Sequence, residues 1–445
     1  MIAPLLVHSS APVFVRSTLL PGTGIDAVLD LLRRGPAGGV DFGWLHGEDG
    51  AVGGGAAVRW EPRPGEGTGA AASWWDGVCA RLEHTGDSAG HASLAFGSFP
   101  FDPGHTRAAP VLVLPEWVLV HRHGGTVLLE ASTRPFPVPA TARLDALLGA
   151  VDQAPQEPVG LHEEHEALDA EQWAERVARG VKRILVGDLD KVVLARQVTV
   201  RGDRPLPVGR LARRLHASYP RCWTFLVDGL VGASPEMLVR REEGLVTSRV
   251  LAGTIGVSGA TPETLGAALA SSSKDLLEHE YAVASVASAL APYCDGMNVP
   301  SAPYVLELPN VLHLATEITA ATSPMTSVLE LVGALHPSAA VCGTPTPTAR
   351  RLIAELESMD RGRYSGPVGW VDSTGDGAWA IALRCGQVDP DDSRVVRLFA
   401  GCGIVADSDP DAEVAESEAK LVPMRTALAE ASAATGRVAS GTGAR

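Results

Sequence analysis

The feature that most constrains the fold is the order of strand-like and helix-like segments between residues 170 and 431. Apolar residues recur at helical spacing from Trp173 to Val186, and Gly187 ends that pattern. Short strand-like runs and long helical blocks follow, without the strict alternation of a parallel sheet. This order predicts an α+β fold, with large antiparallel sheets covered by helices in one two-lobed unit.

The expected elements lie mainly in the second part of the chain. We expect strands at residues 111–114, 117–120, 191–195, 223–227, 237–240, 378–383 and 395–400, and helices at 173–186, 265–290, 326–335 and 411–431. Residues 1–160 are richer in glycine and proline, whereas residues 165–431 carry more of these helix and strand patterns. We expect residues 433–445 to form a flexible tail.

Composition narrows the class of protein. The chain has 445 residues, a formal net charge of −15 and 45% hydrophobic residues, which fits a globular protein. The acidic balance argues against nucleic-acid binding, but local cations can still bind a small anion. No apolar run is long enough to span a membrane, and residues 1–20 lack the pattern of a secretory signal. The six cysteines contain no C-x-x-C pair, so we expect free thiols and a cytoplasmic location.

Two expected helices each carry a pair of carboxylates three residues apart. Asp275 and Glu278 form one pair, and Glu413 and Glu416 form the other, with Lys420 one turn further on. Two such faces can converge on one hard cation, and oxygen ligands favour Mg²⁺. The alternative is two solvated acidic faces, which are common on helices.

Other candidates each have a structural alternative. Glu236 follows Ser-Pro and is either a catalyst or a helix-start residue, and Lys191 at a loop-to-strand junction is either functional or solvated. The glycine-containing segments 251–254 and 400–404 either bind an anion or form tight turns. Arg384 lies in an apolar segment expected to be a strand, where its guanidinium would need a carboxylate partner.

Taken together and in order, these segments resemble the chorismate-utilising enzymes. That family includes isochorismate, salicylate, anthranilate and aminodeoxychorismate synthases. The resemblance covers about residues 170–431, while residues 1–160 resemble the family's variable N-terminal part only loosely. It rests on motifs at residues 187–196, 232–236, 251–254, 274–279, 313–316, 335–337, 341–345, 364–366 and 399–405, and on Glu416 and Lys420.

Two positions separate the reactions within this family. The resemblance implies that Lys191 marks members that add water to chorismate. Ala252 stands where typical aminodeoxychorismate synthases have a lysine nucleophile. Both positions therefore indicate an isochorismate or a salicylate synthase.

The resemblance also implies roles for the site residues. Lys191 would act as the base toward water, and Glu236 as the acid toward the departing hydroxyl. Glu278 and Glu416 would hold Mg²⁺, with Asp275 and Glu413 orienting its waters. The expected substrate-binding residues are Gly253, Thr254, His313, Tyr364, Arg384, Gly401 and Lys420. For His313, a packed core histidine is an equally weighted interpretation.

We therefore expect an isochorismate synthase of the menaquinone or a siderophore pathway, acting on chorismate as a monomer or homodimer. The alternatives are a salicylate synthase, which adds pyruvate elimination, and a catalytically idle chorismate-binding protein. Lys191 and Glu236 together argue against the idle protein, since binding alone requires neither.

Overall fold

The structure is a computed structural model, and it describes residues 11–34, 39–85, 92–136, 158–164, 169–257, 261–308 and 311–433. Most strands of the described residues belong to two large sheets, in which nearly all pairs are antiparallel. The larger sheet has 13 strands, in the order β10 (Leu161–Glu163), β11 (Lys191–Gly202), β23 (Val395–Ile404), β22 (Cys385–Val388), β13 (Leu230–Ser234), β12 (Trp223–Val227), β2 (Phe42–His46), β3 (Asp49–Gly54), β8 (Trp117–Arg122), β9 (Gly125–Ser132), β1 (Val13–Leu19) and β5 (Leu82–His84), with β19 (Gly343–Thr344) beside β11.

The second sheet has 10 strands and includes the long antiparallel pair β15 and β18. Its order is β16 (Cys294–Asn298), β18 (Val311–Thr322), β15 (Leu245–Gly256), β14 (Met237–Glu242), β21 (Gly377–Ile381), β20 (Pro367–Asp372), β6 (Leu94–Ser98), β7 (Val111–Leu114) and β4 (Val58–Arg59), with β17 (Tyr304–Leu308) beside β18.

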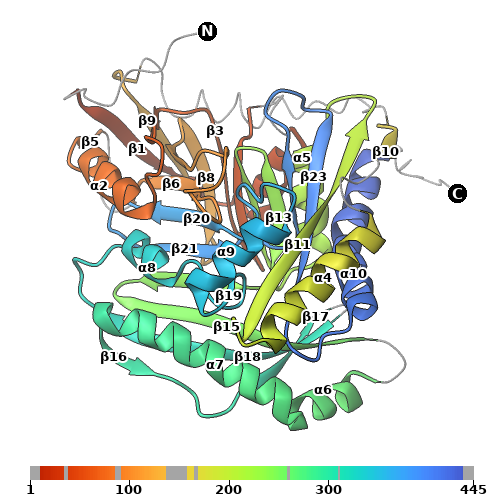
Figure 1. Ribbon diagram of the computed structural model, residues 1–445. Helices are drawn as coiled ribbons and strands as arrows, with labels where there is room; N and C mark the ends of the chain where they lie inside the picture. Colours follow the sequence, from red (N-terminus) through yellow and green to blue (C-terminus); the bar gives the residue numbers. More distant parts are fainter. Residues whose placement is uncertain are drawn as a thin grey trace, which may run out of the picture.

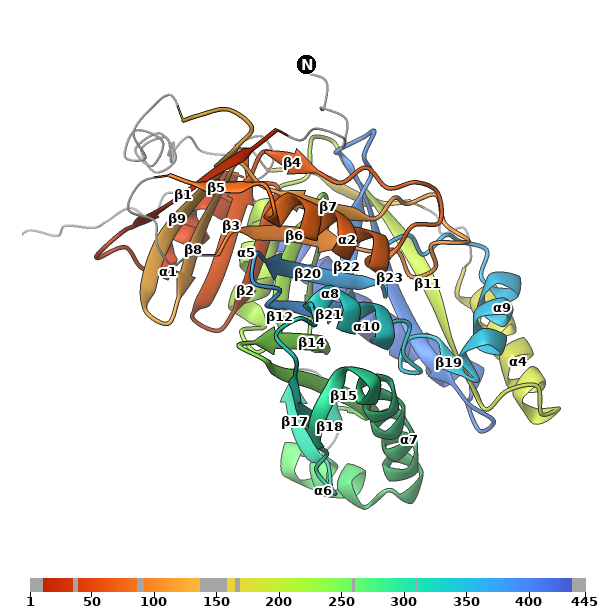
Figure 2. The same ribbon diagram turned by 90° about the vertical axis from the view of Figure 1, so that its left-hand side faces the viewer.

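Helices cover the outer faces of these sheets (Figure 1). They are α1 (Ile25–Leu31), α2 (Thr68–Cys79), α4 (Ala170–Leu185), α5 (Val208–Ser218), α6 (Pro262–Ser271), α7 (Ser273–Leu290), α8 (Val328–Leu335), α9 (Thr346–Leu356) and α10 (Pro410–Ser432). In Figure 2, α6 and α7 form a layer with β15, β17 and β18 below the rest of the molecule. Helix α10 packs on β23 and lies against both α4 and α5.

Strands from the two halves of the chain are neighbours in both sheets. Strand β2 pairs with β12 in the larger sheet, and β6 pairs with β20 in the other. Large buried side chains, among them Trp75, Trp173 and Trp379, fill the core. The glycine-rich first part of the chain therefore completes the sheets that the second part begins, which confirms the predicted mixed fold with large antiparallel sheets.

Several element predictions were wrong in their bounds, and three of these differences have a clear physical reason. The helix expected at 265–290 is two helices, because Ser272 adopts an extended conformation and its side chain caps α7 by accepting from the Asp275 N–H. The strand expected at 191–195 continues to Gly202, since its whole length pairs with β23. The strand expected at 378–383 ends at Ile381, before a left-handed residue (φ 49°) at Arg384.

Cysteine and membrane predictions can also be compared with the structure. All six cysteines are free thiols, as expected. Within the described part of the chain, no helix combines the length and apolar character that crossing a bilayer requires.

Candidate active site

A cavity of about 240 Å³ lies where the two sheets approach each other beside α7 and α10. Every site residue predicted from the sequence lines it, except Thr254 and Glu278. Thr254 belongs to β15 and Glu278 to α7, but their side chains lie outside the described residues. The lining residues from the prediction are Lys191, Glu236, Gly253, Asp275, His313, Tyr364, Arg384, Gly401, Glu413, Glu416 and Lys420.

Glu236 is the buried acid of the cavity. It lies directly before β14, and its backbone is held on both sides: its N–H donates to Ser234 Oγ (3.2 Å) and its carbonyl accepts from Ile381 N–H (3.1 Å). Burial raises the pKa of Glu236 to about 7, although the positive charges of Lys191 and Lys420 act in the opposite direction. At neutral pH this carboxyl group can therefore donate a proton.

Lys191 opens β11, as its position at a loop-to-strand junction suggested. The residue pairs with Thr344 of β19, and its side chain passes over Gly403 of β23. A Cβ atom at residue 403 would lie 2.9 Å from Lys191 Cε, so the glycine leaves room for the lysine. The ammonium end therefore lies in the cavity that also contains Glu236.

Two further cations line the cavity. Lys420 Nζ contacts Glu416 Oε1 at 2.5 Å and donates to the Gly401 carbonyl at 2.8 Å. Burial lowers the pKa of Arg384, which lies between β21 and β22. Among the described side chains no ion pair to Arg384 forms, so the expected carboxylate partner is replaced by the longer-range charge of Glu416. Since no described carboxylate is in direct contact with Arg384, its guanidinium can bind a substrate carboxylate.

The first turns of α10 supply a group of possible metal ligands. Glu413 accepts from Ser408 Oγ (2.8 Å), and burial raises its pKa. Burial also disfavours ionisation of Glu416, but Lys420 and Arg384 outweigh this effect and lower its pKa. Donor atoms of Glu413, Glu416 and Cys402 all lie within 4.8 Å of one another, which suits a divalent cation.

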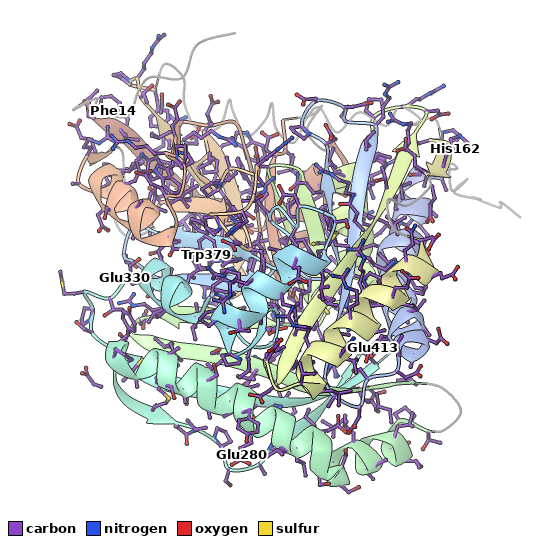
Figure 3. All side chains as sticks on the ribbon, in the orientation of Figure 1. Phe14, His162, Glu280, Glu330, Trp379 and Glu413 are labelled. Atoms are coloured by element: carbon purple, nitrogen blue, oxygen red, sulfur yellow. The ribbon has the colours of Figure 1, made fainter. Side chains whose placement is uncertain are left out.

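Asp275 reaches the same cavity from α7. Its side chain packs against Gly253, a left-handed residue (φ 76°) where β15 bulges between Ala252 and Thr254. The segment 251–254 is therefore a bulged strand, and the segment 400–404 is part of β23, so neither is a tight turn. In Figure 3, Glu280 points outward from α7, while Glu413 lies close to the junction with the α6–α7 layer.

His313 and Tyr364 form neutral walls of the cavity. Burial lowers the pKa of His313 to about 3, aided by Arg384 and Lys420, so its imidazole stays neutral at physiological pH. Tyr364 is buried and stacks on Phe399, with ring centroids 4.9 Å apart and planes 11° from parallel. His313 is thus both buried and part of the cavity, which combines the two interpretations of this residue.

The sequence analysis missed several lining residues. Among them are Arg361, Ser408 and Phe399. Cys402, a possible metal donor beside Glu413 and Glu416, was also missed. Arg361 stands in the segment Arg361-Gly-Arg-Tyr364, which places two arginines in a turn next to apolar strands. That concentration of cations was the available signal for a buried arginine.

The cavity brings together a buried carboxyl group, cationic side chains and a group of possible cation ligands, which fits an enzyme for a small molecule. The comparisons with known proteins make the class particular: the chain belongs to the family described as chorismate binding enzyme, whose model matches residues 42–429.

Relatives and solved structures agree with this assignment. The isochorismate synthase MenF of Bacillus subtilis is 32% identical over 367 residues, which cover 75% of this chain and 74% of that protein. The structure of the menaquinone-specific isochorismate synthase MenF from Escherichia coli aligns with a TM-score of 0.77 and 25% identity, over 95% of this chain and 97% of the other. The putative 2,3-dihydroxybenzoate-specific isochorismate synthase DhbC from Bacillus anthracis aligns with a TM-score of 0.72 and 30% identity, over 90% and 99%.

Proposed function

We propose that this protein is an isochorismate synthase, which converts chorismate to isochorismate. The observation that carries the proposal is the buried carboxyl group of Glu236, with a pKa raised to about 7, in one cavity with Lys191. Replacing the C4 hydroxyl group with a hydroxyl at C2 requires a base and an acid that act on different oxygen atoms. The relatives named isochorismate synthase support the same reaction.

In this reaction Lys191 accepts a proton from the attacking water as the new C2–O bond forms. The ring double bonds shift, the C4–O bond breaks, and Glu236 donates its proton so that the hydroxyl leaves as water. A carboxyl group with a pKa near neutrality suits this donation, because it is protonated in part and still a competent acid. Atoms and charge balance without any redox partner.

The cations and backbone groups of the cavity would bind the two carboxylates of chorismate. Arg384 and Lys420 supply positive charge, while Gly253 and Gly401 allow the substrate to approach the backbone closely. Tyr364 and the neutral His313 would complete the wall beside the ring. Local charge therefore outweighs the net charge of −15.

Glu416 and Glu413 of α10, with Asp275 and Glu278 of α7, would hold Mg²⁺. When bound, this ion supplies positive charge that neutralises the substrate carboxylate. The close carboxylates of α10 support such a site, and oxygen donors favour Mg²⁺ over softer ions. Among the described residues, the Cys402 thiol is a soft donor near these carboxylates. The cytoplasmic location and the monomeric or dimeric state stay predictions.

The test is to incubate the protein with chorismate and Mg²⁺ and to identify the product by chromatography. Isochorismate supports the proposal, and salicylate as the main product would instead make the protein a salicylate synthase. No consumption of chorismate would leave only a binding protein. Lys191→Ala and Glu236→Gln should each reduce kcat by about 10²–10⁴-fold, with chorismate binding retained.

A further inference from the structure

The strand that carries Lys191 has an edge that no full-length neighbour covers. Strand β19 pairs with it only at Lys191 and Val192, and β10 pairs with it only from Val200 to Gly202. Between these points the backbone groups of Val193 and Ala195 face away from β23. An unsatisfied buried backbone group is costly, so each of these groups needs a partner.

Side chains take the place of the missing strand. Ala195 N–H donates to Glu357 Oε1 at 2.7 Å, and the Val193 carbonyl accepts from Arg361 Nη2 at 2.7 Å. Trp173 Nε1 donates to the Ala195 carbonyl at 3.3 Å, and Val193 N–H donates to the Cys342 carbonyl at 2.9 Å. The four backbone groups of Val193 and Ala195 are therefore satisfied, three of them by side chains.

Glu357 and Arg361 also form a buried, two-pronged ion pair. Arg361 Nη2 lies 2.6 Å from Glu357 Oε1, and Arg361 Nε lies 2.8 Å from Glu357 Oε2. Both side chains are 4% exposed. The fork geometry of the guanidinium holds the carboxylate in one orientation. This ion pair therefore lies along the edge of β11, and both of its side chains are bonded to backbone groups of the strand.

Arg361 also bonds residues that line the cavity. Arg361 donates to the Val341 carbonyl (3.0 Å) and to Ser365 Oγ (3.2 Å), and its own carbonyl accepts from Tyr364 N–H (3.0 Å). Arg361 lines the cavity, whereas Glu357 is not among the described residues that do. Any effect of Glu357 on turnover must therefore pass through the groups that it holds.

We propose that Glu357 is a positioning residue that holds Lys191 in place for its reaction with water, through its hydrogen bond to β11 and its ion pair with Arg361. This proposal rests on the function proposed above, because Lys191 is the group that Glu357 positions.

The kinetic test uses Glu357→Gln, which keeps the shape of the side chain and removes its charge. We expect kcat for chorismate to fall by about 10²-fold, as for a small displacement of a reacting group, with little change in KM. The matched control is Glu130→Gln, which weakens the buried two-pronged pair between Glu130 and Arg16 (2.5 and 3.0 Å) on β9 and β1, remote from the cavity. An unchanged kcat in Glu357→Gln, or an equal loss in Glu130→Gln, would overturn the proposal.

A spectroscopic test does not depend on turnover. The chain has four lysines, Lys182, Lys191, Lys274 and Lys420, so ¹³C-labelled lysine gives Cε signals that single substitutions can assign. Glu357→Gln should shift or broaden the Lys191 signal and leave that of Lys182 unchanged, whereas an unmoved Lys191 signal contradicts the proposal. If wild-type protein does not consume chorismate, the proposed function fails, and this measurement still tests the positioning of Lys191.

A milder variant covers the case in which Glu357→Gln does not fold. Trp173→Phe removes only the donor to the Ala195 carbonyl and keeps an aromatic ring in the core. We expect the Lys191 signal to move in the same direction by a smaller amount, with a smaller loss of kcat. A normal signal and a normal kcat in this variant would also contradict the proposal.

Discussion

At the scale of single residues, the cavity gives its carboxyl groups different tasks by giving them different surroundings. Glu236 is fully buried in the cavity, and this burial raises its pKa to about 7 against the opposing charges of Lys191 and Lys420. Burial also acts on Glu416, but the direct contact with Lys420 lowers its pKa. One carboxyl group can thus donate a proton while the other stays anionic for a cation, although both are glutamates.

The raised pKa of Glu236 predicts a pH-dependent cost in stability. The folded protein holds this proton up to about pH 7, whereas the unfolded chain releases it near pH 4.5, so stability is lost as pH rises between these values. A change from 4.5 to about 7 corresponds to about 3 kcal/mol. Relative to wild type, Glu236→Gln should gain about that much in free energy of unfolding when pH increases through this range. Urea titrations at several pH values measure it, and a constant difference between the two proteins would contradict the prediction.

Gly403 gives a second prediction at this scale. A methyl group at residue 403 would lie 2.9 Å from Cε and 3.4 Å from Nζ of Lys191, so Gly403→Ala should push the end of that side chain aside. Because a flexible side chain can move, we expect little change in the free energy of unfolding but a clear loss of kcat. Gly296→Ala is the control, since nothing lies within 4 Å of its new methyl group. Equal kcat values for both variants would show that the position of Lys191 does not limit turnover.

At the scale of elements, α10 is the helix that joins the cation site to the larger sheet. Asp409 caps it by accepting from the Ala412 N–H, so the helix begins where Glu413 and Glu416 reach the cavity. Further along, Glu418 pairs with the buried Arg196 of β11 at 2.8 Å. One face of α10 therefore carries the possible metal ligands, and a neighbouring position fastens the helix to the strand of Lys191.

This division of α10 predicts different results for two neighbouring glutamates. Glu416→Gln should abolish turnover at low Mg²⁺ and raise the Mg²⁺ concentration needed for half-maximal rate, because one anionic ligand is lost. Glu418→Gln should lower the free energy of unfolding and leave the Mg²⁺ dependence unchanged, since it loses contacts only to Arg196 and Arg425. Rates measured across an Mg²⁺ series test both variants. A normal Mg²⁺ dependence in Glu416→Gln would exclude it as a ligand.

The same elements show what sequence patterns can and cannot predict here. The spacing of Glu413, Glu416 and Lys420 predicted one helix face, and the structure places all three in the cavity. The sequence analysis joined α6 and α7 into one helix, although residues 271–275 are all polar and Ser272 stands three residues before Asp275, as a helix N-cap does. Arg361 was missed: the two arginines of the segment 361–364 indicated a buried cation, but its role at the β11 edge depends on pairing between distant segments, which leaves no local pattern.

At the scale of the whole molecule, the two sheets place segments from the entire chain around one small cavity. Its described titratable lining consists of the two proposed catalytic groups, the anionic ligands of α7 and α10, three cations, His313 and Tyr364. His313 has a pKa lowered to about 3, and burial raises the pKa of Tyr364, so neither exchanges protons readily near neutral pH. This lining suits a single exchange of hydroxyl groups, with Glu236 as the proposed acid and Lys191 as the proposed base.

The titratable residues that line the cavity predict which product the protein releases. Salicylate formation requires a second step, in which the proton at C2 of isochorismate passes to the departing pyruvoyl group. Among the described lining residues no further group is poised for that transfer, so it would have to occur within the substrate itself. We expect isochorismate as the main product at neutral pH, with at most a trace of salicylate. Salicylate fluorescence, followed with and without added isochorismate-pyruvate lyase, measures the division. A strong signal without the lyase would contradict the proposed product, while the family and the acid–base roles of Lys191 and Glu236 would still stand.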